Sequence, residues 1–296
     1  MAVLEAPKSA SRLRRRADHF TIPCARRRLD YRGRPLVMGV LNVTPDSFSD
    51  GGRFAGPEAA VRQGLRMAAK GADLIDIGGE STKPGARSVP LDVELQRVIP
   101  VIRRLAREVR IPISVDTSKA EVAFQAVAAG ASLINDVTAL RGDGQMAAVA
   151  ARNGAALILM HMRGIPRTMQ GRPRYDDVVR EVAEFLLSAA AKAEQAGIER
   201  SRILMDPGLG FGKTVGHNLE LLKSLGRFVE LGFPVVVGPS RKSFIGNTLD
   251  AGLEDRLAGT LACVAHAFRC GAHMVRVHDV QPVVHLLKML EAIELS

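Results

Sequence analysis

The stretch His273-Met-Val-Arg-Val-His278 reads as a short β-strand, and a helix-like segment at residues 280–290 follows it. It is the eighth strand–helix unit in a chain of 296 residues, and it completes the count that decides the fold. Eight alternating units predict an α/β protein built as a (β/α)8 TIM barrel, and a doubly wound open sheet is the alternative. The predicted strands lie at residues 35–43, 74–78, 111–116, 132–136, 155–161, 203–205, 234–238 and 273–278.

Helix-like segments separate these strands. They are predicted at residues 57–70, from 91, from 118 or 119, at 176–195, near 218 and at 255–268. The segment at 176–195 carries apolar residues at helical spacing. No composition shift or low-complexity segment divides the chain after residue 35. We therefore expect one barrel domain over residues 21–296, preceded by a basic, poorly ordered arm at residues 1–20.

The net charge of +10 is concentrated near the N-terminus. Residues 1–34 hold ten Lys or Arg against three Asp or Glu, which accounts for +7 of the +10. Few aromatic residues interleave with these charges, so we expect a solvated extension and no nucleic-acid partner. An organelle-targeting segment is less favoured, because a long Ser-rich amphipathic stretch is missing.

The three cysteines have no zinc-like spacing, and their odd number argues against a disulfide framework. Free thiols are typical of a reducing compartment, which favours a cytoplasmic protein. No apolar run approaches the roughly 20 residues of a membrane span, so we expect no membrane partner.

Polar residues stand at the C-terminal ends of the predicted strands, where a barrel places its active site. A single strand-end Asp or Asn often only caps the next helix, and for Asp136 this alternative is equally good. Polar groups at the ends of all the strands point instead to one converging pocket. The set is Asn42, Glu80, Ser81, Thr82, Asp116, Asn135, Asp136, His161, Asp206, Ser240, Arg241, Lys242, Ser243, Arg276 and His278.

Side-chain alternation refines the last strand. Met274, Arg276 and His278 fall on one face, and the two intervening valines fall on the other. A guanidinium and an imidazole that project together into a barrel mouth suit an anion, and phosphate fits best.

The segment Asp206-Pro-Gly-Leu-Gly-Phe-Gly-Lys213 follows a predicted strand and resembles a nucleotide-binding P-loop. That motif requires four residues between its first glycine and the Gly-Lys-Thr sequence, and here there are three. The spacing therefore excludes a P-loop. Two longer loops, residues 42–52 and 81–90, are expected to act as mobile lids over the barrel mouth.

At these residues the sequence resembles the dihydropteroate synthase family. The matching stretches are ordered along the chain and spread over residues 21–290. They are Met38-Gly-Val-Leu-Asn-Val-Thr-Pro-Asp-Ser-Phe-Ser-Asp-Gly-Gly52, Asp76-Ile-Gly-Gly-Glu-Ser-Thr82, Ser114-Val-Asp-Thr117, Ile134-Asn-Asp-Val137, Leu159-Met-His-Met162, Asp206 to Lys213, Ser240-Arg-Lys-Ser243 and Val275-Arg-Val-His278.

The resemblance implies condensation of (7,8-dihydropterin-6-yl)methyl diphosphate with 4-aminobenzoate, giving 7,8-dihydropteroate and diphosphate. It also implies a homodimer and a Mg²⁺ cofactor contacted by Asn42. Asp116, Asn135, Asp206 and Lys242 are the residues it assigns to the pterin, and Asp116, Asp206 and Lys242 are expected to be catalytic. It assigns Thr82, Arg276 and His278 to the diphosphate, and Phe48, Pro84, Phe211, Lys242 and Ser243 to the 4-aminobenzoate pocket.

The chemistry of these residue types agrees with such roles. A pterin edge presents amino and ring N–H donors, which carboxylates accept. Loss of diphosphate leaves positive charge on the pterin methylene, so a dissociative displacement without a covalent enzyme intermediate is expected. The residues leave open whether bulk water or the diphosphate takes the aniline proton.

One position departs from the family pattern. Lys83 follows Ser-Thr where the family usually has Arg, and lysine keeps the charge but loses the bidentate fork.

The sequence leaves three alternatives to the synthase. They are a pterin barrel that transfers a methyl group from a reduced folate, a catalytically silent pterin-binding paralogue, and a nucleic-acid-binding protein that uses the basic arm. The sequence leaves the role of the arm and the sensitivity to sulfonamides open.

Overall fold

The computed structural model describes residues 19–44, 56–83 and 85–295. Eight parallel strands pair in the order β8-β7-β6-β5-β4-β3-β10-β9. Met205 on β8 pairs with Val235 beside β9, which closes the sheet into a barrel. The closure confirms the (β/α)8 prediction and excludes the open doubly wound sheet. The strands are β3 (Leu36–Asn42), β4 (Leu74–Gly78), β5 (Ile113–Asp116), β6 (Leu133–Asp136), β7 (Ala156–Met160), β8 (Ile203–Asp206), β9 (Val236–Val237) and β10 (Met274–Val277).

All eight predicted strands exist, and the largest difference is at β9. The sequence predicts a strand over residues 234–238, but only Val236–Val237 forms one. Pro234 has no amide hydrogen to give to a neighbouring strand, so it contributes only its carbonyl, which accepts from Met205 N at 2.9 Å.

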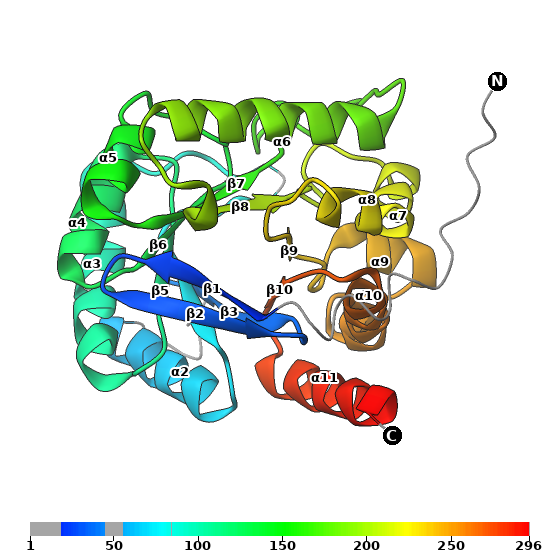
Figure 1. Ribbon diagram of the computed structural model, residues 1–296, viewed down its shortest axis with the longest axis horizontal. Helices are drawn as coiled ribbons and strands as arrows, with labels where there is room; N and C mark the ends of the chain where they lie inside the picture. The colour runs from blue at the N-terminus through cyan, green and yellow to red at the C-terminus, as the bar shows by residue number, and fades with distance from the viewer. Residues whose placement is uncertain (1–18, 45–55, 84, 296) are drawn as a thin grey trace.

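The helices form a ring around the strands (Figure 1). Three of them, α5, α8 and α9, were not predicted, because elements of one or two turns carry little periodic signal. The helix predicted at 176–195 begins two residues later, where the Asp177 side chain accepts from Arg180 N and caps it. The helices are α2 (Pro57–Ala69), α3 (Leu91–Glu108), α4 (Ala120–Ala129), α5 (Met146–Asn153), α6 (Val178–Gln195), α7 (Val215–Lys223), α8 (Leu225–Val229), α9 (Ser243–Leu249), α10 (Leu257–Cys270) and α11 (Val280–Leu295), with 3-10 turns at Arg200–Arg202 and Glu254–Arg256.

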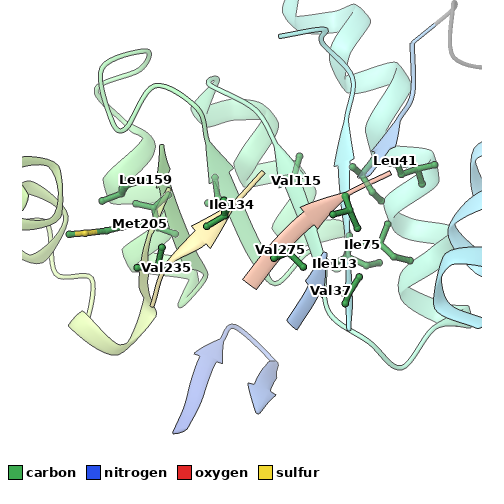
Figure 2. Packing of buried hydrophobic residues seen from close by; sticks show 14 of the residues in the cluster. Val37, Leu41, Ile75, Ile113, Val115, Ile134, Leu159, Met205, Val235 and Val275 are labelled. Atoms are coloured by element: carbon green, nitrogen blue, oxygen red, sulfur yellow. The ribbon is translucent and has the colours of Figure 1, made fainter. Parts of the chain in front are cut away.

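Alternation along the strands separates two apolar layers. Outward-facing residues such as Ile75, Val115 and Val275 pack between the barrel and the helices (Figure 2). Inward-facing residues such as Met38 and Met274 fill the floor of the barrel. Arg276 therefore faces inward and the adjacent valines face outward, as the sequence predicted for β10.

The expectation of a solvated extension over residues 1–34 is wrong for its second half. Strands β1 (His19–Cys24) and β2 (Arg27–Arg32) form an antiparallel hairpin. One face of the hairpin is apolar, and Ile22, Cys24 and Leu29 pack against the inward-facing residues of the barrel floor. Figure 1 shows the hairpin lying across the barrel. Residues 1–18 lie outside the described part of the chain, so the arm predicted at 1–20 is tested only at its end.

The hairpin is expected to stabilise the barrel. Ile22 is 1% exposed, so Ile22→Ala should lower the free energy of unfolding by about 2–5 kcal/mol in urea denaturation. Arg28 is exposed and makes an exposed ion pair with Asp30, so Arg28→Ala is a matched control within about 0.5 kcal/mol of the parent. Equal midpoints for the parent and Ile22→Ala would contradict the role of the hairpin.

Candidate active site

Above the apolar floor, the barrel interior turns polar. Asp76, Asp116, Asn135 and Asp206 are all buried, and they come from β4, β5, β6 and β8. Each occupies an inward-facing position. In β4, β6 and β8 the preceding inward-facing residue is an apolar residue of the barrel floor. The predicted pterin residues Asp116, Asn135 and Asp206 therefore share one interior.

An ion network centred on Arg276 ties this interior together. The guanidinium donates from Nε to Asp76 Oδ2 at 2.7 Å and from Nη2 to Asp116 Oδ2 at 2.7 Å. Asn135 Nδ2 donates to the same Asp76 oxygen at 3.0 Å. Asp76 belongs to a matching sequence stretch, but it was not predicted as a site residue, because it lies inside a predicted strand and not at its end.

Burial controls the protonation of the carboxylates. It raises the pKa of Asp116 to about 7, although the Arg276 guanidinium acts in the opposite direction. Burial also raises the pKa of Asp206, against the lowering effect of the Gly208 amide, which donates to Asp206 Oδ1 at 2.7 Å. Two carboxyls with raised pKa values in one cleft are typical of a functional site.

The glycine loop after β8 folds tightly over the end of β7. Gly208 has φ +69°, and a Cβ there would lie 1.9 Å from the carbonyl oxygen of His161. Gly210 has φ +80°, and a Cβ there would lie 3.0 Å from Cδ of Lys242. Only glycine tolerates both the backbone and the contact, so these glycines are needed for close packing.

Lys213 holds this loop from within. Its side chain is buried, and Nζ donates to the carbonyl oxygens of Gly208 at 2.9 Å and Phe211 at 3.1 Å. Nζ also lies 2.9 Å from Nδ1 of His161, whose pKa burial lowers to about 2, so the neutral ring accepts this hydrogen bond. The lysine of the apparent P-loop is thus a structural clamp, which agrees with the exclusion of a P-loop from its spacing.

Lys242 and Phe211 form a second edge of the site. The ammonium of Lys242 lies 4.0 Å from the centroid of the Phe211 ring, a cation–π contact between the segments after β9 and β8. Burial lowers the pKa of Lys242 to about 8, and the Arg276 charge adds to this effect. Ser243 is the exposed first residue of α9, directly after Lys242.

His278 is held as a neutral ring. Its Nδ1 lies 3.0 Å from Ser240 Oγ, which also accepts from the His278 amide at 3.1 Å. Burial lowers the pKa of His278 to about 4, and the Arg276 charge lowers it further. The sequence predicts a guanidinium and an imidazole that suit an anion. In the structure two carboxylates accept from the Arg276 guanidinium, and the His278 ring is neutral.

Asp136 faces away from this interior. Its carboxylate accepts from the backbone amides of Thr138 at 2.8 Å and Leu140 at 2.7 Å and from the Thr138 hydroxyl at 2.6 Å. Asp136 therefore forms a turn, which is neither the pocket role nor the helix cap that the sequence left open.

Asn42 and Thr82 lie at the mouth. Asn42 ends β3 in register with Gly78 and is partly exposed. Thr82 and Asp116 line a cavity of about 520 Å³ under the second loop, together with Arg87, Thr138, Met162 and Arg167. The predicted lid at residues 42–52, with Phe48, falls mainly outside the described residues, as does Pro84. Lys83 is exposed.

A metal site built from protein side chains alone is not found. Within residues 19–44, 56–83 and 85–295, no three His, Cys, Asp or Glu side chains group as metal ligands. The amide oxygen of Asn42 is a hard donor of the kind Mg²⁺ accepts, and Mg²⁺ usually takes its other ligands from water and substrate phosphates. The donor chemistry at Asn42 therefore fits this ion. In the same described residues, no helix is long and apolar enough to cross a membrane.

Comparison with known proteins gives consistent matches. A family model described as "Pterin binding enzyme" matches residues 38–278. Dihydropteroate synthase of Escherichia coli (strain K12) is 49% identical over 258 residues, which are 87% of this chain and 91% of that protein.

Solved structures agree with the sequence relatives. Xanthomonas albilineans dihydropteroate synthase with 4-aminobenzoic acid has a TM-score of 0.89 and 49% identity, covering 94% of this chain and 100% of that chain. The enzyme from the same organism in complex with 7,8-dihydropteroate has a TM-score of 0.84 and 46% identity, with the same coverage of both chains.

The clamp role of Lys213 can be tested by Lys213→Met. The variant leaves the Gly208 and Phe211 carbonyls without their buried donor, which should cost about 1–3 kcal/mol of unfolding free energy. Backbone amides of residues 208–212 should also exchange faster with solvent than in the parent. Lys223→Met, at an exposed position at the end of α7, is the control. Unchanged exchange in the 208–212 loop would show that Lys213 does not hold it.

Proposed function

The chain belongs to the pterin-binding enzymes and, within them, to the dihydropteroate synthase family, and on that premise we propose how its residues perform the reaction. It condenses (7,8-dihydropterin-6-yl)methyl diphosphate with 4-aminobenzoate and releases diphosphate and 7,8-dihydropteroate. The observation that carries the proposal is the buried set of Asp116, Asn135 and Asp206, brought from three strands into one interior.

The pterin edge is bound by this set. Its amino and ring N–H groups are donors, and the oxygens of Asp116 and Asp206 accept them, while the Asn135 amide offers both a donor and an acceptor. Hydrogen bonds to charged groups in a dry interior are worth about 1.5–3 kcal/mol each. A few such contacts orient the ring, so that its methylene carbon faces the second substrate.

Charge separation is the main problem of the chemical step. As the C–O bond to diphosphate breaks, positive charge develops on the pterin methylene and negative charge on the leaving group. Asp116 and Asp206 lie on the pterin side and stabilise the positive charge, whereas Thr82, Arg276 and His278 are assigned to the diphosphate side. No step requires a covalent bond to the protein, because the aniline nitrogen is itself an adequate nucleophile.

The second substrate is placed beside Phe211 and Lys242. The cation–π contact fixes the aromatic ring and the ammonium relative to each other. The charges of Asp206 and Asp116 raise the pKa of Lys242, whereas burial lowers it, so Lys242 lies near the carboxylates of the pterin side. Phe211 and Ser243 border the 4-aminobenzoate. This arrangement aligns the amine with the methylene carbon, and such positioning contributes much of the rate enhancement in a two-substrate displacement.

Mg²⁺ is proposed as the cofactor. Asn42 would hold the ion together with diphosphate oxygens and water. When bound, the ion neutralises charge on the leaving diphosphate.

We also propose that the enzyme is a cytoplasmic homodimer. Cys24 and Cys263 are free thiols, as is common in a reducing compartment. Exposed leucines lie on helices α7 and α9, which contact each other, and on the turn after α9, namely Leu219, Leu249 and Leu253. An apolar group of this kind fits the face buried between two copies of the chain.

The activity and the role of Asp206 are tested together by following diphosphate release. Release should require both 4-aminobenzoate and Mg²⁺, and Asp206→Asn should lower kcat/KM about 10- to 100-fold, the factor that corresponds to one lost charged hydrogen bond. Asp136→Asn is the matched control, because this carboxylate braces a turn. It should lower the melting temperature and leave kcat/KM close to that of the parent. Near-normal turnover by folded Asp206→Asn would remove the assigned role.

The dependence of kcat/KM on pH should be bell-shaped. Below about pH 7, Asp116 takes up a proton and loses the negative charge that binds the pterin donors; above about pH 8, Lys242 loses its charge. The two apparent values belong to the coupled cluster as a whole. Measured from pH 5.5 to 9.5, Asp116→Asn should lose the acid limb and keep the basic limb. An unchanged acid limb in that variant would assign it to another group.

A further inference from the structure

Asp76 is buried in the centre of the barrel, on β4, with 0% exposure. Its Oδ2 accepts from both Arg276 Nε and Asn135 Nδ2, at 2.7 and 3.0 Å. These donors come from β10 and β6, so one oxygen atom joins side chains from opposite sides of its own strand. One of them is assigned to the pterin edge and the other to the diphosphate end.

The contact fixes how the Asn135 amide is turned. Because Nδ2 donates to Asp76, the amide oxygen Oδ1 must face the other way. Without the carboxylate, the amide could rotate by half a turn and present a donor where the pterin requires an acceptor. The Arg276 guanidinium is fixed similarly, since Nε is held by Asp76 and Nη2 by Asp116.

Fold stability does not explain this carboxylate. The second oxygen, Oδ1, is buried and has no hydrogen-bond partner within the described residues, and neither has the neighbouring Ser114 Oγ. A buried, partly satisfied charge is costly, and a buried ion pair seldom stabilises a protein more than a well-packed apolar pair does. A purely structural position would be filled better by an apolar side chain.

We propose that Asp76 is a positioning residue for the reaction, which sets the orientation of Asn135 and Arg276 through one shared oxygen. It does not touch the substrate; it couples the group that reads the pterin to the group at the diphosphate end. This inference rests on the proposed function.

The test is Asp76→Asn in the full-length enzyme. The amide of Asn has nearly the same shape as the carboxylate, but it has no negative charge to attract the two donors that Asp76 Oδ2 accepts from. We expect kcat/KM for the dihydropterin diphosphate to fall about 10- to 100-fold, on the scale of one charged hydrogen bond. The KM for 4-aminobenzoate should change little, because the residues that Asp76 orients, Asn135 and Arg276, are not those assigned to 4-aminobenzoate.

A double-mutant cycle separates positioning from general damage. If Asp76 acts partly through Asn135, then Asp76→Asn should cost a smaller factor in the Asn135→Ala background than in the parent. The acid limb of the pH profile should also move to lower pH in Asp76→Asn. Asp116 is surrounded by Arg276, Asp76, Glu94 and Lys242, and loss of the Asp76 charge removes one of the groups that raise its pKa.

The matched control is Asp73→Asn, just before β4. Asp73 forms an ion pair with Arg34 at 3.2 Å and accepts from Val37 N at 2.8 Å, near the start of β3. This variant should lose stability but keep the kcat/KM and the pH profile of the parent.

Three results would overturn the proposal: an unchanged kcat/KM in folded Asp76→Asn, fully additive effects in the cycle, or an unmoved acid limb. If Asp76→Asn does not fold, Asp76→Leu/Arg276→Met removes both charges and is compared with Arg276→Met alone. The double variant should be the more stable of the two, but it should be less active, because Asn135 loses the acceptor that orients its amide. Equal activity of the two variants would contradict a role through Asn135. Failure of the proposed function is a separate outcome, in which the parent itself forms no dihydropteroate.

Discussion

The polar interior of this barrel depends on the ion pairs that the Arg276 guanidinium forms with two buried carboxylates. Asp76 and Asp116 are both buried, and two carboxylates in a dry interior repel each other unless a cation lies between them. Arg276 supplies this cation with one donor for each, at 2.7 Å. The network lets acidic side chains remain deep in the barrel, where a substrate can meet them without competing water.

Closure of the sheet makes this network possible. Side chains alternate along each strand, so all inward positions share one narrow volume. The lower positions are apolar and continue into the β1–β2 hairpin, which packs against them as a floor. The floor keeps one end of the barrel dry, and the polar positions are left at the end where the strands enter their long loops.

The segment after β8 resembles a phosphate-binding motif, but its glycines and lysine have a structural role. Its glycines and lysine resemble a phosphate cradle, but Lys213 points inward and donates to carbonyls of its own loop. The loop it holds carries Phe211, and Phe211 in turn contacts Lys242. A buried lysine therefore holds the loop that carries Phe211, the residue proposed to border the second substrate.

The sequence by itself determined the barrel, because eight apolar runs at regular spacing have few other arrangements. It also determined that Asp116, Asn135 and Asp206 end strands and that Lys242 follows one. Tertiary structure decided which of the polar residues meet. The roles of Asp76 and Lys213 were missed because each depends on a partner that is distant in the chain: Arg276 is 200 positions from Asp76, and His161 is 52 from Lys213. Asp136 turned outward because its neighbour Asn135 takes the inward position. The hairpin was not predicted because its many arginines indicated a solvated segment. Its apolar face becomes buried only against a barrel floor that distant strands assemble.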